Sequence, residues 1–383
     1  LRFPEFQGEW EESTIGEEFD LYSGNTPSRL NKEHFNGAIN WISSGELKEH
    51  YIADTKEKIS DEAAKTLKML PIGTFVIAIY GLEADGVRGT GSITKTEATI
   101  SQACMAFISK GKVQNEFLYS WYKKHGNVIG IRYAQGTKQQ NLSYDIIEKF
   151  KIAYPTFQEQ EKLNKFIALL DERIATQNKI IEDLKKLKSA IIEIEYTPNT
   201  KTTSHIGNVI EQISKRNKNN AIQNVLSVSN RQGFIKQSDQ FENRNVASED
   251  TSNYKIVEKN DFAFNPARIN VGSIARLTTF EKGIISPMYI CFRTQENVAP
   301  EYIDFFFESK HFYCEIQKRL EGSVRQCLSF EGLCNIPFSL PSLEMQQRIG
   351  KRLFTLGQKI KTETDLLELL NKQKQYLLRQ MFI

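Results

Sequence analysis

The chain consists of one unit written twice, and this internal repeat constrains the fold more than any local motif. A shift of 186 residues, which carries Gly136 onto Gly322, places residues 136–195 over residues 322–381 without a gap. The matched pairs include Pro155 with Pro341, Gln160 with Gln346, Leu170 with Leu356, Ile174 with Ile360, Thr176 with Thr362, Glu182 with Glu368, Leu184 with Leu370, Lys186 with Lys372 and Lys188 with Lys374. Chance does not explain so long an ordered series.

Upstream of this stretch the match is looser but keeps its order. The pairs there are Ile15-Gly16 with Ile206-Gly207, residues 91–93 with 272–274, and residues 100–101 with 285–286. A period of this length is too long for a solenoid or a propeller. We therefore expect two copies of one domain, related by a pseudo-two-fold axis, each with a variable globular part followed by a similar helix.

The segment that ends each copy predicts a long helix. Residues 157–195 and their repeat contain no proline and are rich in Lys, Glu, Leu and Gln, which favour helix. Their apolar residues recur every seven positions in two registers, which is typical of a coiled-coil seam. The registers are Leu163, Leu170, Gln177, Leu184, Ile191 and Ile167, Ile174, Ile181, Lys188 in the first helix, and Ile349, Leu356, Glu363, Leu370, Leu377 and Leu353, Ile360, Leu367, Lys374 in the second. We predict that the two helices pair antiparallel as a spacer; the alternative is that each packs on its own globular part.

The globular parts indicate mixed α and β structure. Residues 75–80 and 261–264 predict buried strands, and the aromatic stretches 117–122 and 302–307 predict short core helices. The expected fold class is α+β: two similar mixed α/β domains separated by two long helices that form an antiparallel coiled coil, with pseudo-two-fold symmetry. The expected boundaries are 1–154 for the first globular domain, 155–196 for the first spacer helix, 197–340 for the second globular domain and 341–383 for the second spacer helix.

Composition excludes several classes of protein. Hydrophobic residues make up 40% of the 383 and charged residues 25%, as in soluble globular proteins, and no apolar run reaches the roughly 18 residues of a membrane span. The scattered cysteines at 104, 291, 314, 327 and 334 form no C-x-x-C pair, so we expect neither a disulfide framework nor a zinc site, and a reducing, cytoplasmic setting. The N-terminus shows no signal-peptide pattern and no initiator Met, so we expect trimming or processing at that end.

The sequence contains no convincing catalytic set. The glycines of residues 86–91 follow neither dinucleotide-binding nor P-loop spacing. The five dispersed histidines lack ligand spacing, so we expect no metal site. Residues 265–268 faintly resemble the Asn-Pro-Pro-aromatic loop of adenine methyltransferases, but the second proline and the aromatic residue are missing. We therefore predict a turn there, with a surface role for Arg268.

Two polar loops recur just before the helices. Lys138, Gln139 and Gln140 in the first copy, and Arg325 and Gln326 in the second, follow a glycine and precede Leu-Ser-aromatic. Arg, Lys and Gln are side chains that pair with guanine or adenine edges or hold phosphates; the alternative is that each loop only caps the next turn. The net charge of +3 argues against a protein that grips DNA mainly through its own phosphate contacts, but allows a reader whose partners supply the grip.

The chain resembles the specificity subunits of type I restriction–modification systems. The resemblance rests on the opening residues 1–10, the two helix starts at 155–160 and 341–346, the two Gly…Gln-x-Leu-Ser segments and residues 265–274. It implies two target-recognition domains that read a split, asymmetric double-stranded DNA site, and two helices that set the gap between half-sites. It also implies a chain without catalysis or cofactor of its own. Two methyltransferase subunits that hold S-adenosylmethionine and methylate adenine at N6 would dock on it, and translocase–endonuclease subunits can join them.

Residues that read bases vary with the target, so the resemblance does not supply them. From side-chain type and loop position, the candidates are Arg88, Lys138, Gln139 and Gln140 in the first reader, and Asn230, Arg231, Arg268, Asn270, Arg325 and Gln326 in the second. Two other classes compete with this interpretation. A coiled-coil scaffold or adhesin explains the helices but not the recurring polar loops, and a nuclease is disfavoured because no cluster of acidic residues with lysine is present.

Overall fold

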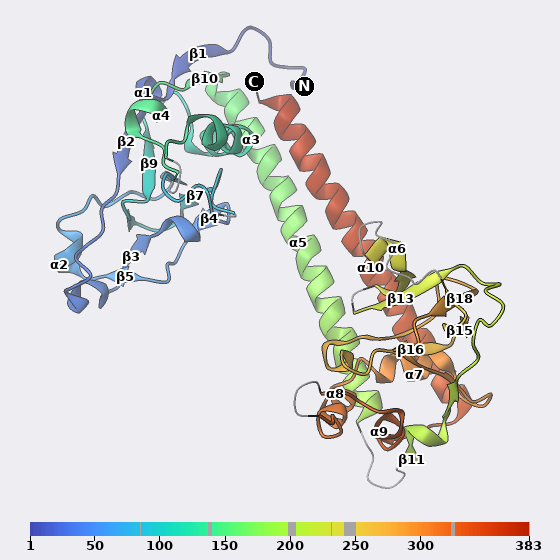
Figure 1. Ribbon diagram of the computed structural model, residues 1–383. Coiled ribbons are helices and arrows are strands. Elements are labelled where there is room, and N and C mark those ends of the chain that lie inside the picture. Colours follow the sequence, from blue (N-terminus) through green and yellow to red (C-terminus); the bar gives the residue numbers. More distant parts are fainter. Residues whose placement is uncertain are drawn as a thin grey trace. The chain divides into compact units, whose positions relative to one another are not determined.

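The computed structural model describes residues 1–84, 86–136, 140–197, 204–230, 232–240, 250–322 and 326–382. The chain divides into two compact units. Unit 1 is formed by Leu1–Asn178 together with Leu366–Ile383, and unit 2 by Lys179–Asp365. Each unit therefore combines a globular part with a piece of both long helices, α5 (Phe157–Tyr196) and α10 (Leu343–Met381) (Figure 1).

The globular part of unit 1 contains a five-stranded sheet of order β2-β9-β6-β7-β4 and a three-stranded sheet of order β5-β3-β8. Its strands are β1 (Glu11–Thr14), β2 (Phe19–Ser23), β3 (Ile39–Ile42), β4 (Tyr51–Ile52), β5 (Lys58–Ile59), β6 (Phe75–Ala78), β7 (Gly91–Thr94), β8 (Ala98–Ile100), β9 (Cys104–Ser109) and β10 (Lys151–Tyr154). Its helices are α1 (Ile15–Glu18), η1 (Lys32–Phe35), η2 (Ser44–Glu46), α2 (Asp61–Ala64), α3 (Asn115–Tyr133) and α4 (Tyr144–Ile147). The fully buried β6 confirms the strand predicted from residue 75, and Phe117 of α3 packs with Phe75 in one core.

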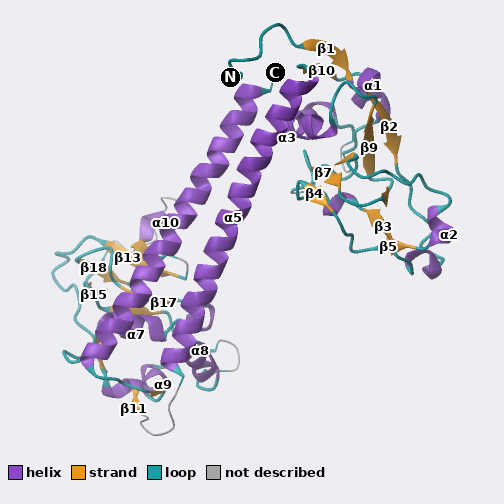
Figure 2. Cartoon of the chain, turned by 180° about the vertical axis from the view of Figure 1, so that it is seen from behind, coloured by secondary structure: helices purple, strands orange, loops and turns teal. Residues whose placement is uncertain are grey.

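The globular part of unit 2 has two four-stranded sheets, of order β12-β19-β16-β17 and β14-β13-β18-β15 (Figure 2). Its strands are β11 (Ser204–His205), β12 (Ile210–Ile213), β13 (Val225–Ser229), β14 (Gly233–Lys236), β15 (Lys255–Glu258), β16 (Phe262–Phe264), β17 (Ile274–Arg276), β18 (Lys282–Ile285), β19 (Ile290–Thr294) and β20 (Pro337–Phe338). Its helices are η3 (Ile206–Asn208), α6 (Gln237–Gln240), η4 (Ile269–Val271), α7 (Pro300–Phe306), α8 (Lys310–Gln317) and α9 (Phe330–Cys334).

The two globular parts repeat one topology. The order β2-β9-β6-β7 in unit 1 corresponds to β12-β19-β16-β17 in unit 2, and the parallel pair β3·β8 corresponds to β13·β18. The loosely matched Ile15-Gly16 and Ile206-Gly207 also occupy the same place. A Cβ on Gly16 would lie 3.1 Å from the Cβ of Glu148, and one on Gly207 would lie 2.8 Å from the Cβ of Cys334, its repeat partner. The duplication predicted from sequence is therefore present in the fold, even where few residues agree.

The aromatic helices differ between the units. In unit 1, α3 runs for 19 residues and is longer than the short helix predicted there. In unit 2, the corresponding stretch breaks into α7 and α8, because the Ser309 hydroxyl accepts a hydrogen bond from the backbone N–H of Phe312 at 3.1 Å and starts a new helix. Both stretches supply core aromatics, as predicted.

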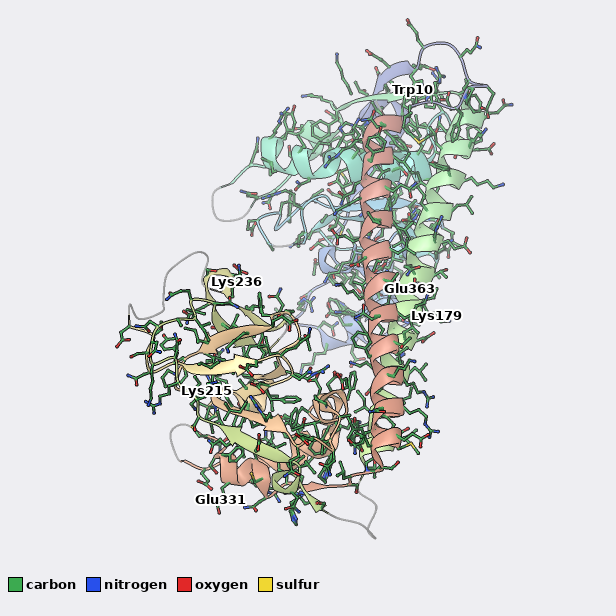
Figure 3. The ribbon with its side chains drawn as sticks, turned by 90° about the vertical axis from the view of Figure 1, so that its right-hand side faces the viewer. Trp10, Lys179, Lys215, Lys236, Glu331 and Glu363 are labelled. Carbon is green, nitrogen blue, oxygen red and sulfur yellow. The ribbon has the colours of Figure 1, made fainter. Side chains whose placement is uncertain are left out.

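The long helices carry a buried stripe at the predicted positions. Every residue of the two seven-residue registers is buried or half-buried, including the polar residues Gln177 and Glu363. Figure 3 labels Glu363 on α10 and, for contrast, the exposed Lys179 of α5. In each unit the pieces of α5 and α10 lie side by side and run in opposite directions (Figures 1 and 2). The antiparallel pairing predicted from the seam is confirmed within each unit.

Both long helices also join the cores of the globular parts. Leu163 and Ile167 near the start of α5 pack in the core of unit 1, where Leu378 and Met381 at the end of α10 join them. In unit 2 the roles are exchanged: Ile349 and Leu353 of α10 and Ile191 and Tyr196 at the end of α5 share one core. The sequence left two alternatives, that the helices pair with each other or that each packs on its own globular part, and both are true. Each unit is built around the start of one helix and the end of the other.

Candidate nucleic-acid interface

The same loop base is built in both units. In unit 1, Gln135 and Asn141 exchange two backbone hydrogen bonds, of 2.8 and 2.9 Å, on either side of residues 136–140. Gly136 has φ of +105°, a conformation that favours glycine. The backbone N–H of Leu142 then donates to the carbonyl of Ile79 at 2.8 Å, so Leu142 lies at the start of the β6–β7 connection (residues 79–90).

Unit 2 repeats each of these contacts. Glu321 and Cys327 exchange backbone hydrogen bonds of 2.9 and 2.8 Å, Gly322 has φ of +108°, and Leu328 N–H donates to the Pro266 carbonyl at 3.0 Å. Leu328 therefore lies beside the β16–β17 connection (residues 265–273). The recurrence predicted from the Gly…Leu-Ser pattern has a structural basis: in each unit the leucine that follows the loop base is hydrogen-bonded to a hairpin connection.

The polar side chains of unit 1 at this place contact one another. Nη2 of Arg88 donates to Oε1 of Gln140 at 2.8 Å, and the backbone N–H of Gln140 donates to the Glu83 carboxylate at 2.7 Å. The backbone N–H of Leu82 donates to the carbonyl of Gln140 at 3.0 Å. The β6–β7 connection thus binds the end of the recurring loop through both backbone and side chain.

In unit 2, the β13–β14 turn lies beside the β16–β17 connection, because Nδ2 of Asn230 lies 3.4 Å from the carbonyl oxygen of Val271. The predicted turn at 265–268 is present: the buried Asn265 side chain accepts from the Ala267 N–H at 3.1 Å. The side chain of Arg268 is exposed. The β16–β17 connection of unit 2 thus contacts the Asn230 side chain and also the backbone of Leu328.

The structure places six of the ten predicted contact residues. Arg88 and Gln140 meet in unit 1, both half-buried. In unit 2, Asn230, Arg268 and Gln326 are exposed and Asn270 is half-buried. Lys138, Gln139, Arg231 and Arg325 lie outside the described residues. The role of all ten in binding remains a prediction.

A buried glutamine near the start of each long helix binds that helix to its globular part. The sequence showed that this glutamine is repeated, but it did not predict the hydrogen bonds that the glutamine forms. Oε1 of Gln160 accepts from the backbone N–H of Gln114, which caps α3, at 2.9 Å, and its Nε2 donates to the Pro155 carbonyl at 2.9 Å. Oε1 of Gln346 accepts from the N–H of Ala299, which caps α7, at 2.9 Å, and its Nε2 donates to the Pro341 carbonyl at 2.9 Å. The signal was the identical Pro-x₄-Gln spacing in both copies.

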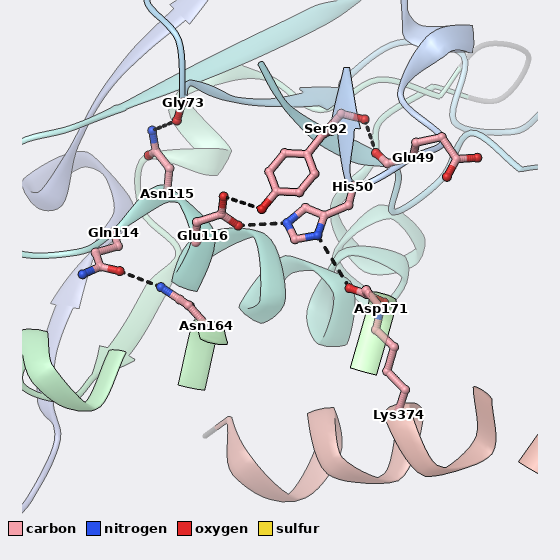
Figure 4. Close-up of polar contacts among 11 residues, drawn as sticks. Glu49, His50, Gly73, Ser92, Gln114, Asn115, Glu116, Asn164, Asp171 and Lys374 are labelled. Carbon is pink, nitrogen blue, oxygen red and sulfur yellow. Dashed lines mark hydrogen bonds and ion pairs between the residues drawn. The ribbon is translucent and has the colours of Figure 1, made fainter. Parts of the chain in front are cut away.

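A polar network joins α3, α5 and α10 in unit 1 (Figure 4). Nε2 of His50 lies 2.9 Å from Glu116, its Nδ1 lies 3.6 Å from Asp171, and Lys374 of α10 pairs with Asp171. The ring of His50 is stacked between Tyr51 and Tyr119, at centroid distances of 4.1 and 4.0 Å. Nothing in the sequence marked these residues as a group, since the contacts are long-range.

The charges of this network shift its pKa values. Burial alone would lower the pKa of His50, but Asp171 and Glu116 outweigh it and hold that pKa above the ordinary value. Burial alone would raise the pKa of Asp171, but His50 and Lys374 lower it. The network therefore favours a charged imidazolium between two carboxylates, which is a structural ion-pair arrangement.

Two further observations bear on chemistry. Over the described ranges, no group of three or more His, Cys, Asp or Glu side chains is placed to hold a metal ion. Among the helices in those ranges, none is both long and apolar enough to span a lipid bilayer.

Comparison with known proteins gives the family. The family described as "Type I restriction modification DNA specificity domain" matches residues 7–186 and again residues 191–372. The EcoR124I/EcoR124II specificity subunit of Escherichia coli is 30% identical over 192 residues, covering 49% of this chain and 46% of that protein. The MjaVIII specificity subunit of Methanocaldococcus jannaschii is 22% identical over 408 residues, covering 98% of this chain and 90% of that protein.

The matched region spans under half of two of these relatives, 46% of the E. coli subunit and 42% of the MjaIX specificity subunit of M. jannaschii. Among solved structures, the type I restriction–modification S subunit from M. genitalium aligns with a TM-score of 0.61 at 15% identity, covering 98% of this chain and 96% of that one. A second, from a study of assembly of a type I restriction–modification system, aligns with a TM-score of 0.59 at 14% identity and covers 98% and 97%. The fold agrees along the whole chain, the family matches each repeat separately, and the chain therefore belongs to the type I restriction–modification DNA specificity family.

Proposed function

We propose that this chain is the DNA sequence-specificity subunit of a type I restriction–modification complex and performs no catalysis itself. Its two target-recognition domains, residues 1–154 and 197–340, each read one half of a split site. The observation that carries the proposal is the loop base repeated in both units, where Gly136 and Gly322 have positive φ and the leucine that follows each loop base is bonded to a neighbouring hairpin. A scaffold would need the helices, but it would not need this recurrence.

The side chains around the two loop bases differ, and this supports an asymmetric target. Arg88 stands beside Gln140 in unit 1, whereas the β16–β17 connection of unit 2 contributes Arg268 and Asn270. Base recognition depends on which donors and acceptors reach the groove edges. Two frameworks that agree in backbone and differ in side chains would therefore read two different half-sites.

The long helices are the proposed spacer and docking element. Residues 155–196 and 341–383 would set the distance between half-sites and bind two methyltransferase subunits, which hold S-adenosylmethionine and methylate adenine at N6. Translocase–endonuclease subunits would join the same assembly, in the cytoplasm. The net charge of only +3 fits a reader that its partners help to hold on DNA.

The test is co-expression with the methyltransferase subunit of the same system, followed by single-molecule mapping of methyladenine across a genome. The proposal predicts one split motif with two unlike halves, and DNA binding by the complex that weakens as salt rises. A variant in which Gly-Ser-Gly-Ser-Gly replaces residues 136–140 should relax only one half of the motif, and the other half serves as the internal control. A stable complex that methylates no motif would contradict the proposal and favour a scaffold.

A further inference from the structure

Arg88 is held in place by the helix beneath it. Its aliphatic stem lies on Gly130 of α3, where a Cβ would come within 2.5 Å of Cγ of Arg88, so only glycine leaves room for the stem. Its Nε is buried, and its Nη2 points at Oε1 of Gln140 at 2.8 Å. Arginine normally samples many rotamers, and this packing selects one.

Gln140 is held at its backbone as well as at its side chain. Its N–H donates to the Glu83 carboxylate at 2.7 Å and its carbonyl accepts from Leu82 N–H at 3.0 Å. With the backbone and Oε1 both fixed, the direction of the carboxamide plane is set before any ligand arrives. Such preorganisation reduces the entropy lost on binding.

The chemistry of the pair fixes which atoms it can offer. A guanidinium has N–H donors only, so the atom of Gln140 that faces Arg88 must be the carboxamide oxygen. A free glutamine reads adenine by accepting from N6 and donating to N7. Here the oxygen is directed to Arg88, and the carboxamide N–H groups of Gln140 remain to be offered. The pair is therefore a donor surface.

A donor surface distinguishes the purines. Guanine presents two adjacent acceptors, O6 and N7, on its major-groove edge, whereas adenine presents the N6 amino group beside N7. The amino group of adenine would meet N–H groups and leave them unsatisfied, which is costly in a buried interface.

We propose that Arg88 and Gln140 form one reading element that selects guanine over adenine in the half-site of the first domain. This inference rests on the proposed function and names the base edge that this part of the interface takes. Arg88 acts through Gln140, by orienting its carboxamide, and is a specificity-determining residue in that sense.

The test uses the co-expressed complex and compares methylated motifs of variants. The wild-type motif should contain guanine at one position, preferred over adenine by roughly 5- to 150-fold. Arg88→Met frees the carboxamide and should admit adenine at that position. Gln140→Ala should relax the same position to any base, and the double variant should be no worse than Gln140→Ala. Arg88→Lys keeps a donor toward Oε1 and should retain guanine.

The controls separate the possible failures. Arg29→Met removes an arginine of unit 1 that pairs with Glu57 through two hydrogen bonds of 2.9 Å, and should leave the motif unchanged. In all variants the second half-site should stay as in wild type. If Arg88→Met and Gln140→Ala relax different positions, or neither changes the motif, the inference is wrong while the proposed function stands. If the wild-type complex gives no motif, both are overturned.

Discussion

Gln160 and Gln346 bind the two long helices to their globular parts in the same way, so a substitution of one can be compared with the same substitution of the other. Replacing Gln160 by Met keeps the length of the side chain but removes its bonds to the Gln114 N–H and to the Lys112 and Pro155 carbonyls. Replacing Gln346 by Met removes the bonds to the Ala299 N–H and the Pro341 carbonyl. No backbone group can be mutated away, so each loss leaves a buried or half-buried polar group without its partner.

The expected loss of unfolding free energy follows from the backbone groups that lose their hydrogen-bond partner. A buried backbone group without a partner costs about 1–3 kcal/mol, and the partly exposed carbonyls recover some of this from water. We expect each variant to lose about 2–4 kcal/mol of unfolding free energy. The loss should be local. In Gln160→Met, the Gln114 amide should exchange its hydrogen at least roughly 30-fold faster, which corresponds to about 2 kcal/mol, while the Ala299 amide is unaffected. Gln346→Met should show the reverse.

The assay is urea unfolding combined with hydrogen exchange at these two amides. Gln158→Met is the matched control, because Gln158 lies exposed on the same helix. If Gln160→Met costs no more than Gln158→Met and leaves the Gln114 amide protected, the Gln160 hydrogen bonds do not position the helix and the reasoning is refuted.

Two further predictions concern unit 1. Because the folded-state pKa of His50 is raised by Asp171 and Glu116, its contribution to stability is complete below about pH 6.5, the unfolded value, and is lost as pH rises through the folded pKa. The difference in unfolding free energy between wild type and His50→Gln should therefore be largest below about pH 6.5 and should shrink as pH rises through the folded pKa. A constant or growing difference would show that His50 is not charged in the fold. Leu370 is 4% exposed, so Leu370→Ala should lower the free energy of unfolding by about 2–5 kcal/mol. Leu369 is 62% exposed, so Leu369→Ala should change that free energy by under about 0.5 kcal/mol. Equal effects of the two substitutions in chemical unfolding would show that the seam is not at the assigned positions.

The helices could be predicted from sequence because their signals are local and repeated. The seven-residue registers required only the order of apolar residues, and the ungapped match gave the same register twice. Even the polar positions agree: Lys374 pairs with Asp171, and its repeat partner Lys188 pairs with Glu308 at 2.6 Å. A seam lysine that reaches a carboxylate explains why polar residues persist at these positions.

The polar contacts of the candidate site and the break between α7 and α8 could not be predicted, because they depend on contacts that the sequence does not show. Arg88 and Gln140 were both predicted as contact residues, but their hydrogen bond across 52 positions requires Gly130 beneath the arginine stem. The break between α7 and α8 depends on one N-cap, Ser309, which looks like any other serine in the chain. His50 gave no signal, because its carboxylate partners come from two helices distant in sequence, Glu116 from α3 and Asp171 from α5.

Exchange of one reader tests the central claim most directly. Residues 1–154 are replaced by the corresponding domain of a relative that recognises a different site, with both long helices kept, and the methylated motif is mapped. The account predicts that one half of the motif changes to that of the donor, while the other half and the gap between them stay as in wild type. A change in both halves, or in neither, would contradict the claim that each unit reads its own half-site.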